Sequence, residues 1–379
     1  MRSKKRGSEV IQRWKRKMIR SLLGGGVIIA LGALVWWGQP PSSSPDTRGN
    51  FAVFDSQSGF ASVTPDHTPT YPQDMAAHSD FATEWWYLTA TLTDANGQAY
   101  GVQWTLFRRA LAPDRKEGWA SQQLYMAHVA ITSDDKQWES ERFARGGIDQ
   151  TGVTLSPFQA WLDDWQWQGG QQPFPARVRA IWPAQGKPVG FTLEVRENGQ
   201  QVKHGEEGYS VRHASQPSAS YYFSLPQLTV KGVLTIAGET IPVTGKGWFD
   251  KEWSNGAMAA EQTGWDWFGL NLDDGRALMV TQIRGTEPFM FGSLLFPDGR
   301  VVTLSQDDIR MLPVSHAKMA EGANLPIRWQ IKVPSEGISL TTQPLNPQSW
   351  MDLSFPYWEG PVEVHGSATG RGFMEATGY

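Results

Sequence analysis

The stretch EWWYLTATLTDANGQAYGVQWTLFR, residues 84–108, decides how this chain folds. It consists of an aromatic segment, a DANG turn signal at 94–97 and a second segment that ends in arginine. A turn signal of this kind between two such segments is typical of antiparallel strands joined by a tight turn. The stretch therefore predicts a β-hairpin.

A second stretch, GWDWFGLNLDDGRALMVTQIR at residues 264–284, repeats this order of features. The matched pairs are Trp85 with Trp265, Tyr87 with Trp267, Leu92 with Leu272, Asp94 with Asp274, and the turn glycines Gly97 with Gly275. Two interpretations are open: a chance likeness between two hairpins, or two copies of one β-domain that each begin with an aromatic hairpin. The second interpretation places a domain boundary near residues 230–245.

Beyond residue 50 the chain shows almost no helical periodicity, but apolar and polar residues alternate in many short runs. Examples are FTLEV (191–195), IRWQIKV (327–333) and ISL (338–340), and turn signals such as ENG (197–199) and PDG (297–299) separate the runs. This pattern predicts many antiparallel strands arranged as barrels or sandwiches. A last strand pair within 362–379 would close the second barrel or return to the first.

The N-terminal part of the chain has a different composition. The first twenty residues carry nine basic side chains and one acid, so with an overall net charge of −4 the other residues sum to −12. A body of that charge makes nucleic acid an unlikely partner. The basic arm indicates membrane topology instead.

An apolar run, SLLGGGVIIALGALVWW at residues 21–37, follows the basic arm. It is short for a membrane-spanning helix and long for the core of a signal peptide. Trp36 and Trp37 suit a helix end at the lipid headgroups, which favours an uncleaved signal anchor over a cleaved signal peptide. In either case we expect the body to face the periplasm, anchored to the inner membrane or released there.

The chain therefore divides into five parts. The Pro/Ser-rich GQPPSSSPDTRGN (38–50) begins a tether between membrane and body. We predict a basic arm at 1–20, a signal anchor or signal peptide at 21–37, a tether at 38–70, a first β-domain at 71–235 and a second at 236–379.

Several kinds of chemistry have no support in the sequence. The chain has no cysteine, and its seven histidines form neither a His-x-His nor a His-Glu-x-x-His motif. It also lacks a phosphate-cradling loop after a strand and a Gly-x-Ser-x-Gly nucleophile elbow. We expect no cofactor and no metal.

The segment GKGWFDKEWS, residues 245–254, surrounds two acids with aromatic side chains. Asp250 and Glu252 lie among Trp248, Phe249 and Trp253, although an apolar environment penalises an ionised carboxylate. Either a buried acid keeps its proton here for chemistry, or the acids sit at a strand end, cap a turn and face water.

Six motifs in order resemble the AttH-like family, a group related to carotenoid 1,2-hydratase (hydroxyneurosporene synthase) and often labelled predicted secreted hydrolase. They are YPQDMAAHSDFATEWWYLTATL, GVQWTLFRRAL, YMAHVAIT, GKGWFDKEWS, GWDWFGLNLDDG and the closing YWEG...GRGFMEATGY, which together extend from about residue 71 to 379. The resemblance implies an all-β fold of two lipocalin-like antiparallel barrels. It also implies an ABC transporter as a partner, because genes of this family commonly lie beside one.

The resemblance also implies a candidate acid. In the hydratases a strand carries an aromatic residue, one intervening residue and an aspartate as the proposed acid, and Trp248 and Asp250 keep that spacing with Trp in place of tyrosine. A His-x-Trp pair on an upstream strand assists the acid there, and the equivalent positions here are Tyr221 and Phe223. We therefore take Asp250, Trp248 and Tyr221 as the catalytic candidates.

Further residues are candidates for binding a ligand, because aromatic walls bind apolar molecules and stabilise cations. Glu84 either lines a cavity or pairs with Arg108 or Arg109, and alternation sends one of Gln103 and Trp104 inward. His128 is expected to be a buried structural histidine. The ligand-binding candidates are Glu84, Trp85, Trp86, Gln103, Phe223, Glu252, Trp253, Trp265 and Trp267.

These features support a lipophilic ligand, isoprenoid-like or lipid-like, as the partner of an exported, membrane-tethered protein. Barrels of this type commonly enclose a ligand. Two functions follow from this expectation: hydratase-type acid catalysis by Asp250, or a non-catalytic carrier or accessory subunit of a periplasm-facing ABC transporter.

Overall fold

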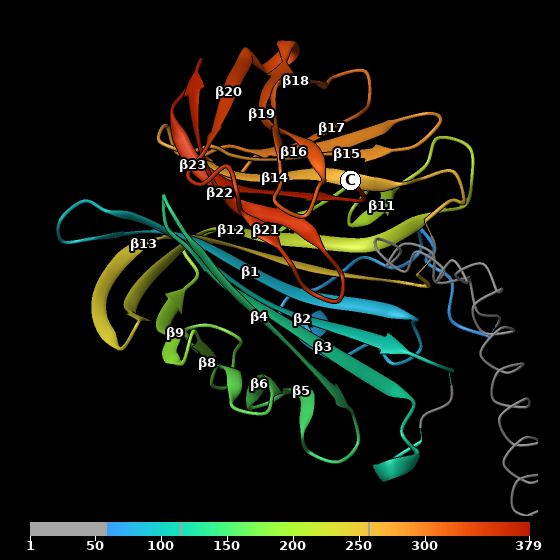
Figure 1. Cartoon of the computed structure of the whole chain (residues 1–379). Coiled ribbons are helices and arrows are strands. Elements are labelled where there is room, and N and C mark those ends of the chain that lie inside the picture. The colour runs from blue at the N-terminus through green and yellow to red at the C-terminus, as the bar shows by residue number, and fades with distance from the viewer. Residues whose placement is uncertain (1–58, 114–115, 257) are drawn as a thin grey trace, which may run out of the picture. The chain divides into compact units, whose positions relative to one another are not determined.

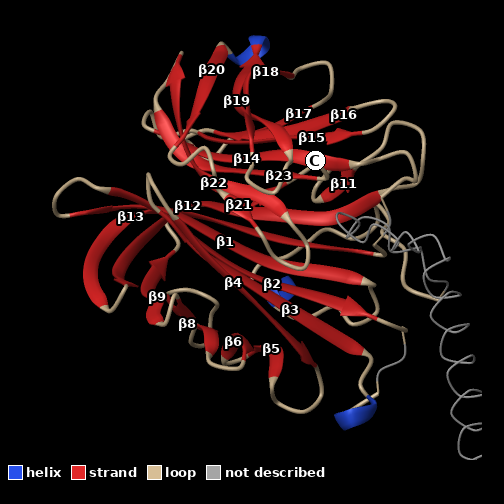
Figure 2. Cartoon of the chain, viewed as in Figure 1, coloured by secondary structure: helices blue, strands red, loops and turns tan. Residues whose placement is uncertain are grey.

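The computed structural model describes residues 59–113, 116–256 and 258–379, and nearly all of their regular structure is β-strand (Figure 2). Three short 3-10 helices accompany the strands: η1 (Gln73–Met75), η2 (Gly118–Ala120) and η3 (Pro334–Glu336). Within these ranges we find no α-helix, and so none that could span a membrane. The predictions for the basic arm, the apolar run at 21–37 and the start of the tether lie outside the described residues.

The first sheet has 13 strands in the order β4-β3-β2-β1-β13-β12-β9-β8-β7-β6-β5, and β10 and β11 pair with β12. Its strands are β1 (Thr83–Asp94), β2 (Ala99–Ala110), β3 (Gln123–Thr132), β4 (Gln137–Arg145), β5 (Thr151–Leu155), β6 (Phe158–Leu162), β7 (Trp165–Gln168), β8 (Ala176–Ala184), β9 (Lys187–Arg196), β10 (Val202–Lys203), β11 (Tyr209–Val211), β12 (Ala219–Ile236) and β13 (Glu239–Ser254).

The second sheet has 10 strands in the order β17-β16-β15-β14-β23-β22-β20-β19-β18, and β21 pairs with β22. Its strands are β14 (Gly264–Leu272), β15 (Ala277–Arg284), β16 (Phe289–Leu295), β17 (Val301–Leu304), β18 (Arg310–Lys318), β19 (Asn324–Val333), β20 (Ile338–Pro344), β21 (Trp350–Met351), β22 (Tyr357–Gly366) and β23 (Gly370–Thr377). Both sheets are barrel-like, so the all-β prediction is confirmed.

The two similar stretches of sequence form equivalent hairpins, one in each sheet. Strands β1 and β2 pair antiparallel, as do β14 and β15. Gly97 and Gly275 have φ angles of 85° and 88°, a backbone conformation that glycine adopts without a steric penalty. On its other side β1 pairs with β13 and β14 pairs with β23, so the hairpins also occupy corresponding places in their sheets.

The last strand pair of the chain closes the second sheet and does not return to the first. Strands β22 and β23 pair with β20 and β14, so they belong to the second sheet. Strands β12 and β13 form a long hairpin within the first sheet, and the sheets change between Ser254 and Gly264 along the chain. The predicted boundary at 235/236 falls in this hairpin, and the division into two domains stays a prediction.

Each sheet encloses its own apolar core. Large aromatic side chains fill the interior of the first sheet, including Trp86, Trp104, Trp167, Phe223 and Phe249, all fully buried. Burying one such side chain stabilises the fold by roughly 1.5–3 kcal/mol. The second sheet has a separate core, which is mostly aliphatic and also includes Trp329 and Trp358.

The outer faces of the two sheets contact each other, with the second sheet lying over strands β1, β2, β12 and β13 (Figure 1). A third apolar cluster forms this contact and includes Tyr87, Tyr222, Trp248 and Trp267. The Tyr87 hydroxyl donates to Glu359 Oε1 over 2.7 Å across the contact. This face, rather than a barrel interior, contains the cavity described next.

Candidate functional site

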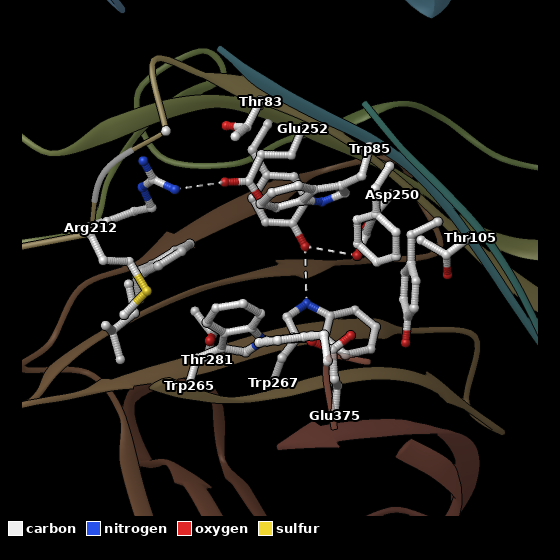
Figure 3. Close-up of a pocket in the computed structure, with 18 residues that line it drawn as sticks. Thr83, Trp85, Thr105, Arg212, Asp250, Glu252, Trp265, Trp267, Thr281 and Glu375 are labelled. Carbon is white, nitrogen blue, oxygen red and sulfur yellow. Dashed lines mark hydrogen bonds and ion pairs between the residues drawn. The ribbon is translucent and has the colours of Figure 1, made fainter. Parts of the chain in front are cut away.

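A cavity lies between the outer faces of the two sheets. Figure 3 shows the side chains of both sheets converging on it. The lining residues are Thr83, Trp85, Tyr87, Thr105, Phe107, Arg212, Tyr222, Asp250, Glu252, Gly256, Met258, Trp265, Trp267, Thr281, Ile283, Phe291, Phe355 and Glu375. The cavity is therefore mainly aromatic, with one arginine and three carboxyl groups.

Strand register explains why the first sheet contributes these residues. Tyr87 in β1 lies opposite Asp250 in β13, and Trp85 lies opposite Glu252. Residues two apart along a strand project from the same face. All four side chains therefore point out of the first sheet toward the second.

The second sheet supplies the opposite wall through the matching hairpin. Trp267 in β14 lies opposite Glu375 in β23, and Trp265 projects from the same face. The aromatic residues that correspond in the two similar stretches thus meet across the cavity: Tyr87 and Trp267 have ring centroids 5.4 Å apart with their rings edge to face.

Asp250 is the most enclosed acid of the cavity, with only 3% of its surface exposed. Its Oδ1 accepts hydrogen bonds from Trp248 Nε1 over 2.8 Å and from the Ser224 hydroxyl. Its Oδ2 accepts from the Tyr222 hydroxyl over 2.9 Å. Burial raises the pKa of Asp250 to about 7, and the charge of Glu252 adds to this, although the three hydrogen bonds oppose the rise.

Two hydrogen-bonded chains connect Asp250 to the second sheet. The Tyr222 hydroxyl, which donates to Asp250, accepts from Trp267 Nε1 over 3.0 Å. His204 Nε2 lies 2.6 Å from Ser224 Oγ, and His204 Nδ1 lies 2.9 Å from Ser293 Oγ. Burial lowers the pKa of His204 to about 3, so the imidazole is neutral at physiological pH. Since Ser224 donates to Asp250, we assign the proton of this neutral ring to Nε2.

The other two carboxyl groups are held less tightly. Glu375 Oε1 accepts from Trp265 Nε1 over 2.7 Å, and burial raises the pKa of this half-buried side chain to about 7. Glu252 Oε1 lies 3.6 Å from Arg212 Nη1, and burial raises the pKa of Glu252 even though the arginine opposes that rise. The cavity therefore holds three carboxyl groups that resist ionisation together.

The pH dependence of the free energy of unfolding should reveal that Asp250 is buried. A carboxyl whose pKa is raised in the folded state contributes stability that is fully present below its ordinary pKa of 3.8 and is lost as the pH rises to about 7. Between pH 5 and pH 8, Asp250→Asn is expected to gain about 2 kcal/mol relative to the wild type in its free energy of unfolding. Urea unfolding at the two pH values measures the difference, and equal slopes with pH for both proteins would contradict the buried position of the acid.

Comparison with known proteins places the chain in a family. The model of the AttH-like family matches residues 62–379. The chain belongs to the AttH-like family. A protein assigned as an AttH from Nitrosomonas europaea is 33% identical in sequence; the match covers 84% of this chain and 99% of that one, with a TM-score of 0.75.

A second solved structure resembles this AttH-like protein more distantly. It is kievitone hydratase from Nectria haematococca, at 15% identity and a TM-score of 0.62, and the match covers 84% of this chain and 96% of that one. At this identity the likeness shows the fold alone. No curated protein matches this AttH-like protein.

Five of the predicted site residues line the cavity: Trp85, Asp250, Glu252, Trp265 and Trp267. Trp248 is not among the lining residues, but its Nε1 is one of the two donors to Asp250 Oδ1. The structure thus brings together residues from β1, β13 and β14, and β1 lies far from the other two strands in the sequence.

Other candidates point away from the cavity. Trp86, Phe223 and Trp253 belong to the core of the first sheet. Tyr221 also faces this core, and its hydroxyl donates to the Thr64 carbonyl over 2.9 Å. The structure places Tyr222, one residue later, beside Asp250 instead. The register explains this: Tyr222 lies opposite Glu252 and Tyr221 lies opposite Trp253, which projects from the other face of β13.

Glu84 and Gln103 also lie outside the lining. Glu84 pairs with Arg108 at 2.8 Å and with Lys251, which confirms the ion-pair interpretation. Gln103 Nε2 donates to the Tyr357 hydroxyl over 2.9 Å and so connects the two sheets. His128 is fully buried and hydrogen-bonds to the same hydroxyl, as expected of a structural histidine.

Sequence reasoning missed several residues of the cavity. Tyr87 had a signal, because it matches Trp267 in the repeated hairpin. Glu375 lies in the closing motif GRGFMEATGY, but nothing in that motif marked it as a site residue. Arg212 follows β11 and has no motif around it. His204 supports Asp250 through Ser224 without lining the cavity, and it follows the two-residue strand β10, so no strand pattern pointed to it. Within the described ranges, no three His, Asp or Glu side chains are placed to hold a metal ion.

Proposed function

We propose that this AttH-like protein binds a lipophilic alkene, isoprenoid-like or lipid-like, between its two sheets and that Asp250 protonates the alkene. One observation carries the proposal: Asp250, a carboxyl group whose pKa burial raises to about 7, lines an aromatic cavity. Protonation of an alkene carbon needs an acid that still holds its proton beside the double bond, and burial raises the pKa of Asp250 so that a large share of the molecules carry this proton at neutral pH. The name of kievitone hydratase, a protein of the same fold, supports water addition as the reaction class.

The proposed reaction adds water in two steps. The Asp250 O–H bond breaks, its proton forms a C–H bond with the π electrons of the alkene, and the other carbon becomes a cation. The faces of Trp85 and Trp265 stabilise this cation. Water then bonds to the cation and loses a proton to the Glu375 carboxylate on the opposite wall. Transfer of that proton back to Asp250 through water restores the starting state.

The surroundings of Asp250 suit this role. Trp248, Ser224 and Tyr222 fix the carboxyl group and stabilise the carboxylate that remains after proton transfer. Tyr222 occupies the supporting role that the family resemblance placed on Tyr221. Two like carboxyl groups in one apolar cavity also favour one protonated and one ionised partner, which is the state that the two steps require.

The alternative proposal uses the same cavity without chemistry. A carrier would hold the lipophilic molecule and pass it to or from a periplasm-facing ABC transporter, and lipocalin-like barrels would serve only as its walls. The basic arm and the apolar run at 21–37 support tethering to the inner membrane, with the body in the periplasm.

Extraction of the purified protein tests ligand binding directly. Organic solvent followed by mass spectrometry is expected to release a lipophilic molecule from the wild type. Thr281→Phe should fill the cavity and release at least fivefold less, because Thr281 is a lining residue. Thr240→Phe, on an exposed part of β13, is the matched control and should retain the molecule. Equal amounts from all three proteins, or none from any, would contradict binding in this cavity.

A further inference from the structure

Arg212 is a buried cation on the wall of the cavity that the proposed reaction does not use. It directly follows β11, and only 8% of its surface is exposed. Its backbone N–H donates to the Ser218 carbonyl over 2.8 Å, and its own carbonyl accepts from Gln262 Nε2 over 2.8 Å. These two hydrogen bonds fix the backbone that carries the Arg212 side chain beside the cavity.

The hydrogen-bonding capacity of this guanidinium is only partly used. Nη2 donates to the Ala219 carbonyl over 3.2 Å, and Nη1 lies 3.6 Å from Glu252 Oε1, which is beyond hydrogen-bonding distance. Nε is buried, and none of the described residues accepts a hydrogen bond from it. Leaving a buried donor unsatisfied is unfavourable, so an acceptor on a ligand at this position would gain affinity.

We propose that Arg212 is the polar anchor of the ligand and that its guanidinium group donates to a carbonyl or hydroxyl oxygen at one end of the molecule. This inference rests on the proposed function, because it assumes that the ligand occupies this cavity. It narrows the ligand class to a neutral oxygenated lipophile with an aldehyde, ketone or alcohol end.

Two other classes of ligand, lipophiles with an anionic end and pure hydrocarbons, fit this cavity less well. Glu252 Oε1 already lies 3.6 Å from Arg212 Nη1, so a carboxylate or phosphate end would compete with Glu252 for one arginine. A pure hydrocarbon would offer the guanidinium group no acceptor and would leave its free donors unpaired in an apolar site. A neutral oxygen satisfies the donor without adding charge.

The position of Arg212 also orients the ligand. Figure 3 shows Arg212, Glu252 and Asp250 in a row along the first-sheet wall. Glu252 and Asp250 are two residues apart on β13, which is ~7 Å along a strand. If Arg212 holds the oxygen of the ligand, the double bond that Asp250 protonates therefore lies several bonds away from that oxygen. It is not the double bond adjacent to the oxygen.

Three probes with one carbon skeleton test the inference by quenching of tryptophan fluorescence: farnesal, β-farnesene and farnesoate. The wild type is expected to bind farnesal at least tenfold more tightly than either the hydrocarbon or the carboxylate. Arg212→Met should lose about tenfold in affinity for farnesal and change less than threefold for β-farnesene. Arg177→Met, at an exposed position of β8, is the matched control and should bind as the wild type does.

Each other outcome contradicts a specific statement. If the wild type binds β-farnesene or farnesoate as tightly as farnesal, the anchor is wrong even when Arg212→Met fails to fold. A preference for farnesal that survives in Arg212→Met, or in Arg212→Lys if the first variant does not fold, excludes Arg212 as its source. If the wild type binds none of the three, the proposed function itself fails for isoprenoid ligands.

Discussion

Replacing Asp250 by asparagine is expected to lower the rate of alkene hydration by about 10³-fold, in the range typical of losing a general acid. Asparagine keeps the shape of the protonated carboxyl group but cannot give up a proton to carbon. Ligand affinity should change less than threefold, because the aromatic walls remain in place. The measurement is incorporation of ¹⁸O from labelled water into the extracted ligand, or into farnesol as a surrogate.

The matched control for this prediction is Asp134→Asn, at an exposed turn between β3 and β4. It should leave both hydration and binding unchanged. Equal hydration by Asp250→Asn and the wild type would favour the carrier over the enzyme. Glu375→Gln separates the two proposed steps: it should stop oxygen incorporation while the alkene still takes up deuterium from D₂O.

Replacing Glu84 by glutamine is expected to have the largest effect on stability, a loss of about 3–5 kcal/mol in the free energy of unfolding. Glu84 is fully buried; its Oε2 accepts from Arg108 Nε over 2.8 Å, and its Oε1 contacts Lys251 Nζ and lies 2.6 Å from His78 Nδ1. Burial alone would raise the pKa of Glu84, but these three cations outweigh it and lower that pKa. Glutamine would leave buried positive charge without compensation.

Urea unfolding of the wild type and three variants at pH 7 checks this prediction. Glu194→Gln is the control, because its partner Lys231 is exposed, and it should cost less than about 1 kcal/mol. The double variant Glu84→Gln/Lys251→Met should recover part of the loss, because it removes the uncompensated lysine. A loss below about 1 kcal/mol in Glu84→Gln would contradict the buried ion cluster.

This cluster matters to the site because Lys251 lies between Asp250 and Glu252 on β13. Its Nζ sits 4.1 Å from the Trp86 ring centroid and 4.8 Å from that of Trp253, on the face opposite the cavity. The ion pair and the two rings therefore hold the strand that carries both carboxyl groups. Glu84, a ligand-binding candidate from the sequence, contributes by fixing this strand.

The fold was largely accessible from the sequence, because its signals are local. Alternation and turn chemistry in 84–108 and 264–284 were sufficient to predict two equivalent hairpins, and the ordered motifs to identify the family. The pairing of β13 with β1 was not accessible, since strand order depends on contacts between distant segments. That pairing assigns residues 239–254 to the first sheet. No local sequence pattern predicts this assignment.

The site was accessible only in part, for a related reason. The acid and its aromatic neighbours share one short segment, so Asp250 and Trp248 could be found together. A shift of one residue in register moves a side chain to the other face of the sheet, which is why Tyr221 was chosen where Tyr222 faces Asp250. Arg212 reaches the cavity from the segment after β11 and Glu375 from β23, and no sequence pattern places either residue beside Asp250.

The pKa of Asp250, measured by ¹³C NMR of the carboxyl carbon in protein labelled at aspartate, tests the central claim most directly. Asp250→Asn identifies the resonance by its disappearance. A buried acid in an aromatic cavity between two sheets is expected to titrate near pH 7. A midpoint near pH 4, the ordinary range of a solvated aspartate, would show that the carboxyl group faces water and would remove the basis for catalysis here.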